Sequence, residues 1–125
     1  MAMKQNIVWF DIPSLDIDRA LSFYSAVLGR QIKKEEFDGV VLGVLPTPDG
    51  GQQGDVVLVK GFKPSADGVM IYLDVNGRLE DAVAAVRANG GIVQKDIHSI
   101  AQYGFCAEVL DSEGNCIALH SLTEN

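Results

Sequence analysis

The side chains best suited to chemistry are few and lie far apart in the sequence. His120 could act as a general base, whereas Cys106 could act as a nucleophile only beside an activating base, which its neighbours in the sequence do not supply. His98 follows Asp96-Ile97 and is expected in a solvated loop. The glycine-rich stretch PDGGQQGD (48–55) lacks the lysine and the strand-to-helix context of a phosphate loop, and is typical of a hairpin tip or lid. No set of nucleophile, base and orienting residue is visible, which disfavours catalysis without a metal.

Alternating strand patterns predict which of these side chains share a face. In residues 7–12 the even-numbered side chains, Val8 among them, would pack on helices, so that Trp9 and Asp11 face the opposite way. Three later segments alternate in the same manner: residues 69–75, 103–110 and 115–121. Together the four segments predict an inner face with these side chains: Trp9, Asp11, Met70, Tyr72, Asp74, Cys106, Glu108, Cys116, Ala118 and His120.

The expected elements follow the same order in the two halves of the chain. A strand, a helix capped by Asp16 and three strands come first, and a strand, a helix capped by Asn76 and three strands follow. The expected strands cover residues 7–12, 31–37, 40–45, 55–60, 69–75, 92–97, 103–110 and 115–121. Because matching positions are 61 or 62 residues apart, we interpret the chain as two pseudo-repeats, 5–62 and 67–122.

Composition and charge exclude several classes of protein. The 125 residues are 47% hydrophobic and 22% charged, which is typical of a single globular domain, residues 1–125. A formal net charge of −7 without a basic cluster disfavours nucleic acid and anionic membranes as partners. No apolar run approaches the roughly 18 residues of a membrane span, and the first residues enter a strand pattern directly, so we expect no signal peptide. The two cysteines then favour free thiols in a cytoplasmic protein.

Three segments are similar to proteins of the vicinal oxygen chelate superfamily, which includes glyoxalase I, the bleomycin-resistance proteins and the extradiol dioxygenases. They are IVWFDIPSLDIDRALSFYSAVLG (7–29), VMIYLDVNGRLEDAVAAVRANGGIV (69–93) and DSEGNCIALHS (111–121). The resemblance implies an α+β fold in which two βαβββ modules curl into a partly open mixed β-sheet barrel, with flanking helices and a ligand cavity. It also implies a homodimer.

Enzymes of this superfamily hold a divalent metal ion with His, Gln or Glu side chains on the inner faces of the strands. The resemblance places the ligand position of the first strand at Trp9, its counterpart in the second module at Met70 and the carboxylate position of the last strand at Ala118. Through the internal repeat, the fourth position falls at Val56 or Val57. None of these side chains can hold a hard or borderline divalent ion, so we expect neither a metal ion nor another cofactor.

Three functions follow as alternatives. The first is a protein that binds a small, partly apolar molecule in a metal-free cavity. The second is an enzyme, either a metal-dependent lyase, isomerase or dioxygenase of the glyoxalase I type or a metal-free catalyst that uses His120 with Asp11 or Glu108. The third is a structural subunit whose cavity is closed by Trp9 and Met70. We favour the first, assign no catalytic residue and expect the ligand to contact Trp9, Asp11, Met70, Tyr72, Glu108 and His120.

Overall fold

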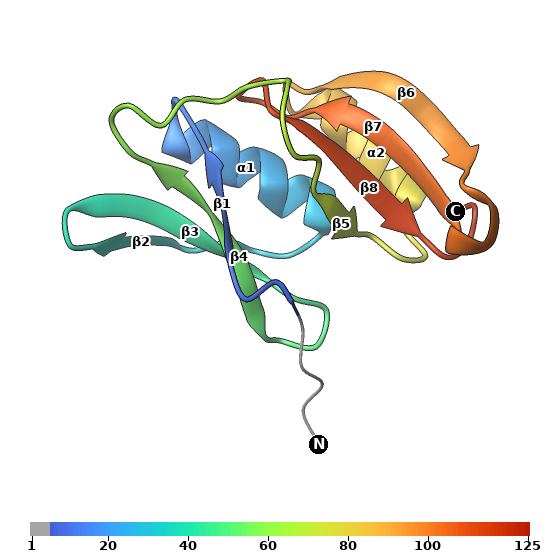
Figure 1. Cartoon of the computed structure of the whole chain (residues 1–125), viewed down its shortest axis with the longest axis horizontal. Coiled ribbons are helices and arrows are strands. Elements are labelled where there is room, and N and C mark those ends of the chain that lie inside the picture. The colour runs from blue at the N-terminus through green and yellow to red at the C-terminus, as the bar shows by residue number, and fades with distance from the viewer. Residues whose placement is uncertain (1–5) are drawn as a thin grey trace.

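Each half of the chain forms one α-helix and one four-stranded sheet in the computed structural model, which describes residues 6–125 (Figure 1). The first half contains β1 (Phe10–Pro13), α1 (Ile17–Leu28), β2 (Lys34–Phe37), β3 (Val40–Pro46) and β4 (Gln52–Leu58). The second half contains β5 (Tyr72–Asp74), α2 (Leu79–Ala88), β6 (Ile92–Ser99), a 3-10 turn (Ala101–Tyr103), β7 (Phe105–Leu110) and β8 (Cys116–Ser121). Residue 5, at which the first predicted repeat begins, lies outside the described residues.

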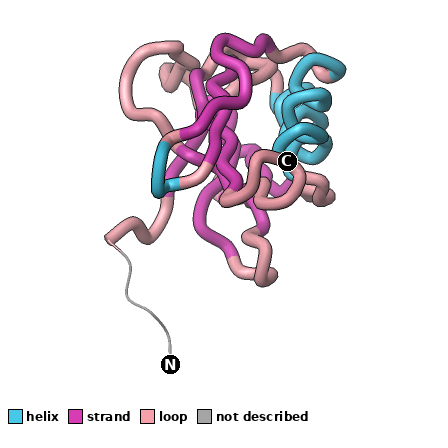
Figure 2. Tube along the Cα trace, turned by 90° about the vertical axis from the view of Figure 1, so that its right-hand side faces the viewer, coloured by secondary structure: helices cyan, strands magenta, loops and turns pink. Residues whose placement is uncertain are grey.

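The two sheets have the same strand order and the same pairing directions. The orders are β1-β4-β3-β2 and β5-β8-β7-β6, and in each sheet the first two strands are parallel while the other neighbours are antiparallel. The helices α1 and α2 contact each other and lie together on one side of the strands (Figure 2). The two mixed sheets do not close into a complete barrel, in agreement with the expected partly open one. The expected α+β fold with flanking helices is thus confirmed. We call the side of each sheet that faces away from the helices its open face.

A cap, an apolar stripe and a stop signal account for α1. The Asp16 carboxylate accepts a hydrogen bond from the backbone N–H of Arg19 at 3.1 Å, and Gly29 ends the helix in a left-handed conformation, with φ of 68°. The buried stripe between them consists of Ile17, Ala20, Leu21, Phe23, Tyr24 and Val27. Burying each large apolar side chain stabilises the fold by about 1.5–3 kcal/mol.

Within the described residues, no helix is long and apolar enough to cross a membrane.

The first strand of each half is shorter than the alternating pattern predicts. β1 begins at Phe10 and β5 at Tyr72, each inside the predicted strand. Val8 and Val69 are 82% and 92% exposed, so the prediction that they pack on the helices is wrong. Alternation indicates where side chains would point, but a strand also needs a partner for its backbone hydrogen bonds, and the pairing of β1 with β4 starts only at Phe10 and Gly54.

Other element boundaries also differ from the expectation. β4 begins at Gln52, inside the glycine-rich stretch, because that segment pairs with the end of β3. β6 continues through His98, which therefore lies in a strand and not in a solvated loop. Asn76 does not cap α2: the N-cap position is Arg78, and Oδ1 of Asn76 instead accepts a hydrogen bond from the backbone N–H of Leu122 at 2.7 Å.

The turn between β7 and β8 joins the second half of the chain to the start of α1. Oε1 of Glu113 accepts hydrogen bonds from the backbone N–H groups of Leu15 and Asp16, at 2.7 and 2.8 Å. Its Oε2 accepts one from Nε of Arg19 at 2.7 Å, which forms an ion pair. Burial opposes the ionisation of Glu113, but these hydrogen bonds hold the pKa of its carboxyl below the usual value. The predicted tight turn therefore also connects the two halves.

Candidate binding site

Two aspartates lie side by side on the open face of the first sheet. Asp11 of β1 and Asp55 of β4 are partners in the parallel register, and the next residue in each strand, Ile12 and Val56, belongs to the helix-facing core. The indole N–H of Trp9 donates to Oδ1 of Asp11 at 3.3 Å and to Oδ2 of Asp55 at 3.4 Å. Asp55 is only 6% exposed, and no N–H or O–H group of the described residues donates to its buried Oδ1.

The proximity of the two carboxyl groups changes the ionisation of Asp55. Burial, the hydrogen bond to Asp11 and the negative charge of Asp11 raise the pKa of Asp55 to about 7, and the indole N–H of Trp9 opposes them only in part. Near neutral pH, Asp55 is therefore protonated for part of the time and donates to Asp11. Sequence reasoning identified Trp9 and Asp11 and missed Asp55, because the strand that carries it is apolar on both faces and shows no clear alternation.

The remaining predicted site residues lie on the second sheet or next to it. Tyr72, Ala118 and Glu108 are successive partners across β5, β8 and β7, and His120 follows on the same face of β8. This register agrees with the shared face that the alternation predicts. Nε2 of His120 donates to the backbone carbonyl of Tyr103 at 2.5 Å, since a carbonyl can only accept. His120 is thus attached to the turn that precedes β7.

Asp11 also lines a cavity between the two halves of the chain. The cavity has a volume of about 290 Å³, and its walls come mainly from β1, from the connection between β4 and β5 and from the start of β8. The lining includes three apolar and two further charged side chains: Phe62, Val69, Ile71, Lys63 and Asp67. A carboxylate at the edge of a mostly apolar cavity could bind a polar group of a ligand whose apolar part fills the cavity.

The predicted site residues do not converge on this one cavity. Tyr72 lines a separate cavity of about 140 Å³ beside β1 and the loop between β3 and β4. Four of the predicted residues line neither of these two cavities: Trp9, Met70, Glu108 and His120. Met70 precedes β5 in a segment without strand pairing. The open faces therefore bring five of the six predicted residues, all but Met70, to one side of the molecule, without gathering them into one pocket.

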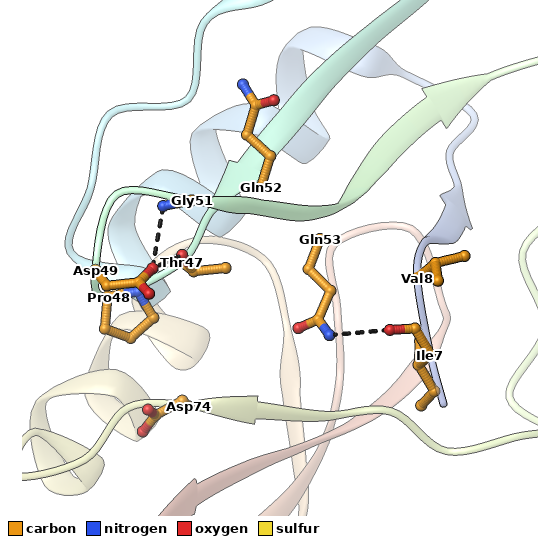
Figure 3. Close-up of a pocket in the computed structure, with 9 residues that line it drawn as sticks. All are labelled: Ile7, Val8, Thr47, Pro48, Asp49, Gly51, Gln52, Gln53 and Asp74. Carbon is orange, nitrogen blue, oxygen red and sulfur yellow. Dashed lines mark hydrogen bonds between the residues drawn. The ribbon is translucent and has the colours of Figure 1, made fainter. Parts of the chain in front are cut away.

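A wider cavity of about 690 Å³ was not foreseen from the sequence (Figure 3). It lies between the segment before β1, the loop between β3 and β4 and the end of β5, and its lining comprises Ile7, Val8, Thr47, Pro48, Asp49, Gly51, Gln52, Gln53 and Asp74. The side-chain amide of Gln53 donates to the carbonyl of Ile7 at 3.5 Å, and the N–H of Gly51 donates to Asp49 at 3.1 Å. These hydrogen bonds join side chains to the backbone of nearby residues, as expected at the tip of a hairpin.

A thiol and an imidazole meet on the second sheet. Cys106 of β7 pairs with His98 of β6, and Sγ of Cys106 lies 3.4 Å from Nε2 of His98. Nδ1 of His98 donates to the carbonyl of Asp96 at 2.8 Å, which leaves Nε2 to face the thiol. Burial and the negative charge of Glu108 raise the pKa of Cys106, which keeps it a thiol. Sequence reasoning missed this contact because irregular pairing of β6 brings the two residues together.

Comparison with known proteins identifies the fold. No family model and no curated protein matches the sequence, whereas solved structures do. A glyoxalase/bleomycin resistance protein from Albidiferax ferrireducens is 16% identical with a TM-score of 0.71, over 94% of this chain and 98% of that one. The trypanothione-dependent glyoxalase I of Leishmania major is 21% identical with a TM-score of 0.63, over 95% and 88% of the two chains. The chain has the vicinal oxygen chelate fold.

The strand register corrects the fourth of the positions that the resemblance to the vicinal oxygen chelate superfamily predicts for metal ligands. Asp11 and Tyr72 occupy matching places in the two halves, and their partners across the sheets are Asp55 and Ala118. The counterpart of Ala118 in the first half is therefore Asp55, and the prediction of residues 56–57 is wrong. An offset of 61 or 62 residues leaves this ambiguity in the sequence, and only the pairing of β1 with β4 resolves it.

The side chains at the four positions that the resemblance predicts for metal ligands do not fit a divalent metal ion. Trp9, Met70 and Ala118 offer an indole, a thioether and a methyl group, and Asp55 supplies the one carboxylate of the set. Across residues 6–125, no group of three or more His, Cys, Asp or Glu side chains is arranged to hold a metal ion. The four aligned positions therefore do not supply the ligands that metal-dependent enzymes of the vicinal oxygen chelate superfamily need.

Proposed function

We propose that the protein binds a small, partly apolar molecule on the open face of its sheets without a metal ion. The proposal rests on Trp9, Met70 and Ala118, which the resemblance aligns with three of the four metal-ligand positions and which cannot hold a metal ion. Aromatic surface nevertheless remains accessible, since Trp9 is 41% and Tyr72 54% exposed. Aromatic surface beside a few polar groups is typical of small-molecule sites.

The ligand would meet different groups on the two sheets. We expect Trp9 and Tyr72 to make apolar contacts, and Asp11, Glu108 or His120 to form hydrogen bonds. Asp11, Tyr72, Glu108 and His120 belong to the open faces, because the core residues of the same strands face α1 and α2. Trp9 precedes β1 and is held beside Asp11 by its indole N–H. The cavity beside Asp11 adds apolar walls for part of the ligand.

The alternatives receive less support. A metal-dependent lyase, isomerase or dioxygenase of the glyoxalase I type rests on the fold, which this chain shares with the Leishmania major glyoxalase I, while the donor set argues against it. Metal-free catalysis by His120 is disfavoured because its Nε2 is bonded to the carbonyl of Tyr103. A purely structural subunit is disfavoured because Trp9 is partly exposed and does not fill a closed cavity.

The homodimer is part of the same proposal. Val8 and Val69 are exposed apolar side chains near the first strands of the two halves, and burying such surface against a second copy would stabilise both. A monomer mass in light scattering at micromolar concentration would contradict this expectation.

Substitutions on the open face test the proposed site once a panel of metabolites, screened in the presence of a chelator, has given a ligand. Trp9→Ala should weaken binding at least tenfold, about 1.4 kcal/mol, because the ligand loses an aromatic contact surface. His120→Ala should weaken it by about 1 kcal/mol if the imidazole bonds the ligand. Phe37→Ala, which removes an exposed aromatic ring from the outermost strand β2, is the matched control and should leave affinity unchanged. Parental affinity in both site variants, measured by calorimetry, would place the site elsewhere.

A further inference from the structure

We propose that the ligand carries a protonated amine, which binds the carboxyl groups of Asp11 and Asp55 next to the indole of Trp9. This inference rests on the proposed function and specifies the chemistry of its ligand. Three observations support it: the paired carboxyl groups on one face, the buried Oδ1 of Asp55, to which no N–H or O–H group of the described residues donates, and the indole N–H that donates to both aspartates.

The pair is left without a positive partner of its own. The three ion pairs found within residues 6–125 involve neither Asp11 nor Asp55. Asp11 is the charged neighbour of Asp55 on β1, and the partner of Asp55 on β3 is the uncharged Val44. Lys63 lines the cavity beside Asp11, together with Asp67. The local charge is therefore negative, and a cation would relieve the repulsion between the two carboxylates.

An ammonium group suits this arrangement for chemical reasons. It has three donors, so it can bond one oxygen of each carboxylate at once. The apolar body attached to it would enter the cavity of about 290 Å³, whose walls include Phe62, Val69 and Ile71. Within the described residues, no third His, Cys, Asp or Glu side chain joins the two aspartates to form a set of metal ligands.

Binding of the amine must displace the proton that the two carboxyl groups share. The pKa of Asp55 is raised to about 7, so below that pH the protonated Asp55 donates to Asp11 and the pair carries one negative charge. An incoming ammonium group replaces this proton, which passes to the buffer. The affinity for the amine should therefore rise as the pH is raised towards about 7 and level off above it.

Two matched probes test the inference: 2-phenylethylamine and its neutral counterpart 2-phenylethanol. Both are titrated by calorimetry and by the fluorescence of Trp9, which is the single tryptophan of the chain. At about pH 8 the amine should bind at least tenfold more tightly than the alcohol, and this advantage should shrink at about pH 5.5 as the pair takes up its proton. Equal binding of the two probes would overturn the amine inference and leave the proposed function standing.

Amide variants assign the effect to the aspartates. Asp55→Asn and Asp11→Asn should each abolish most of the advantage of the amine over the alcohol. Asp38→Asn is the control, because it removes one exposed charge in the turn between β2 and β3, where φ of 53° is well tolerated by asparagine. An equal loss in the control would show a general charge effect and overturn the inference. Competition by Mg²⁺ or Ca²⁺ that depends on Asp55, or no binding of the amine at any pH, would also overturn it.

Discussion

Replacing Glu113 with alanine should lower the free energy of unfolding by about 3 kcal/mol. The Glu113 carboxylate is buried and accepts hydrogen bonds from two backbone N–H groups at the start of α1 and from the Arg19 guanidinium. Alanine would leave the N–H groups of Leu15 and Asp16 without their acceptor and Arg19 without its ion pair. The substitution would also break the link between the two halves of the chain, so the loss should be larger than for a surface ion pair.

Urea unfolding followed by circular dichroism measures this effect. Glu113→Gln keeps an amide oxygen as acceptor for the backbone N–H groups but loses the charge and the acceptor for Arg19, so it should cost less than alanine. Arg19→Ala should also cost less, since half of the Arg19 side chain is exposed. If Glu113→Ala lowered the free energy of unfolding no more than Arg19→Ala, the backbone hydrogen bonds of Glu113 would contribute little to stability.

Replacing Asp55 with asparagine should instead raise the free energy of unfolding, by about 2 kcal/mol at about pH 8. The pKa of Asp55 is raised from 3.8 to about 7 in the folded protein, so the folded state holds this proton more tightly than the unfolded chain. The folded state is then penalised progressively as the pH rises from about 4 to about 7, and fully above that range. Each pKa unit corresponds to about 1.4 kcal/mol, and the buried amide recovers only part of the difference.

The pH dependence separates this effect from a simple packing change. Unfolding is measured in urea at about pH 8 and at about pH 4, and the stabilisation by Asp55→Asn should be present at the higher pH and small at the lower one. Asp38→Asn, far from the pair, should show no such dependence. A stability gain that does not change with pH, or a loss at about pH 8, would contradict the shared-proton pair.

A side chain that lowers stability at neutral pH is typical of a binding or catalytic position. Asp55 has this property, because it is buried beside a second carboxyl group, and the amine inference gives the arrangement a use. The stability measurement on Asp55→Asn needs no ligand, so it tests the electrostatics of the pair independently of the binding experiments.

The helices and the faces of several strands were predictable because their signals are local. Asp16 caps α1, and the alternation that placed Tyr72, Glu108 and His120 on one face agrees with the register. Strand length was less predictable, because hydrogen-bonded pairing depends on a distant segment. Val8 continues the alternating pattern of β1, yet the pairing of β1 with β4 begins only at Phe10 and Val8 is exposed.

The candidate site was predictable only in part, for the same reason. Trp9 and Asp11 follow from the alternation around β1, whereas Asp55 lies in a strand with apolar residues on both faces. The contact between His98 and Cys106 depends on two shifts in the register of β6, which leave no local mark in the sequence. Long-range pairing therefore determines the residues that sequence reasoning missed.

The metal content of the dialysed protein tests the central claim most directly. Elemental analysis, followed by calorimetric titration with Ni²⁺, Zn²⁺, Mn²⁺ and Fe²⁺, should show no stoichiometric metal ion and no saturable binding. The reason is that Trp9, Met70 and Ala118, which cannot coordinate these ions, occupy positions that the resemblance predicts for metal ligands. A value near one metal ion per chain, lost in Asp55→Asn, would contradict the account and point to a metal-dependent enzyme.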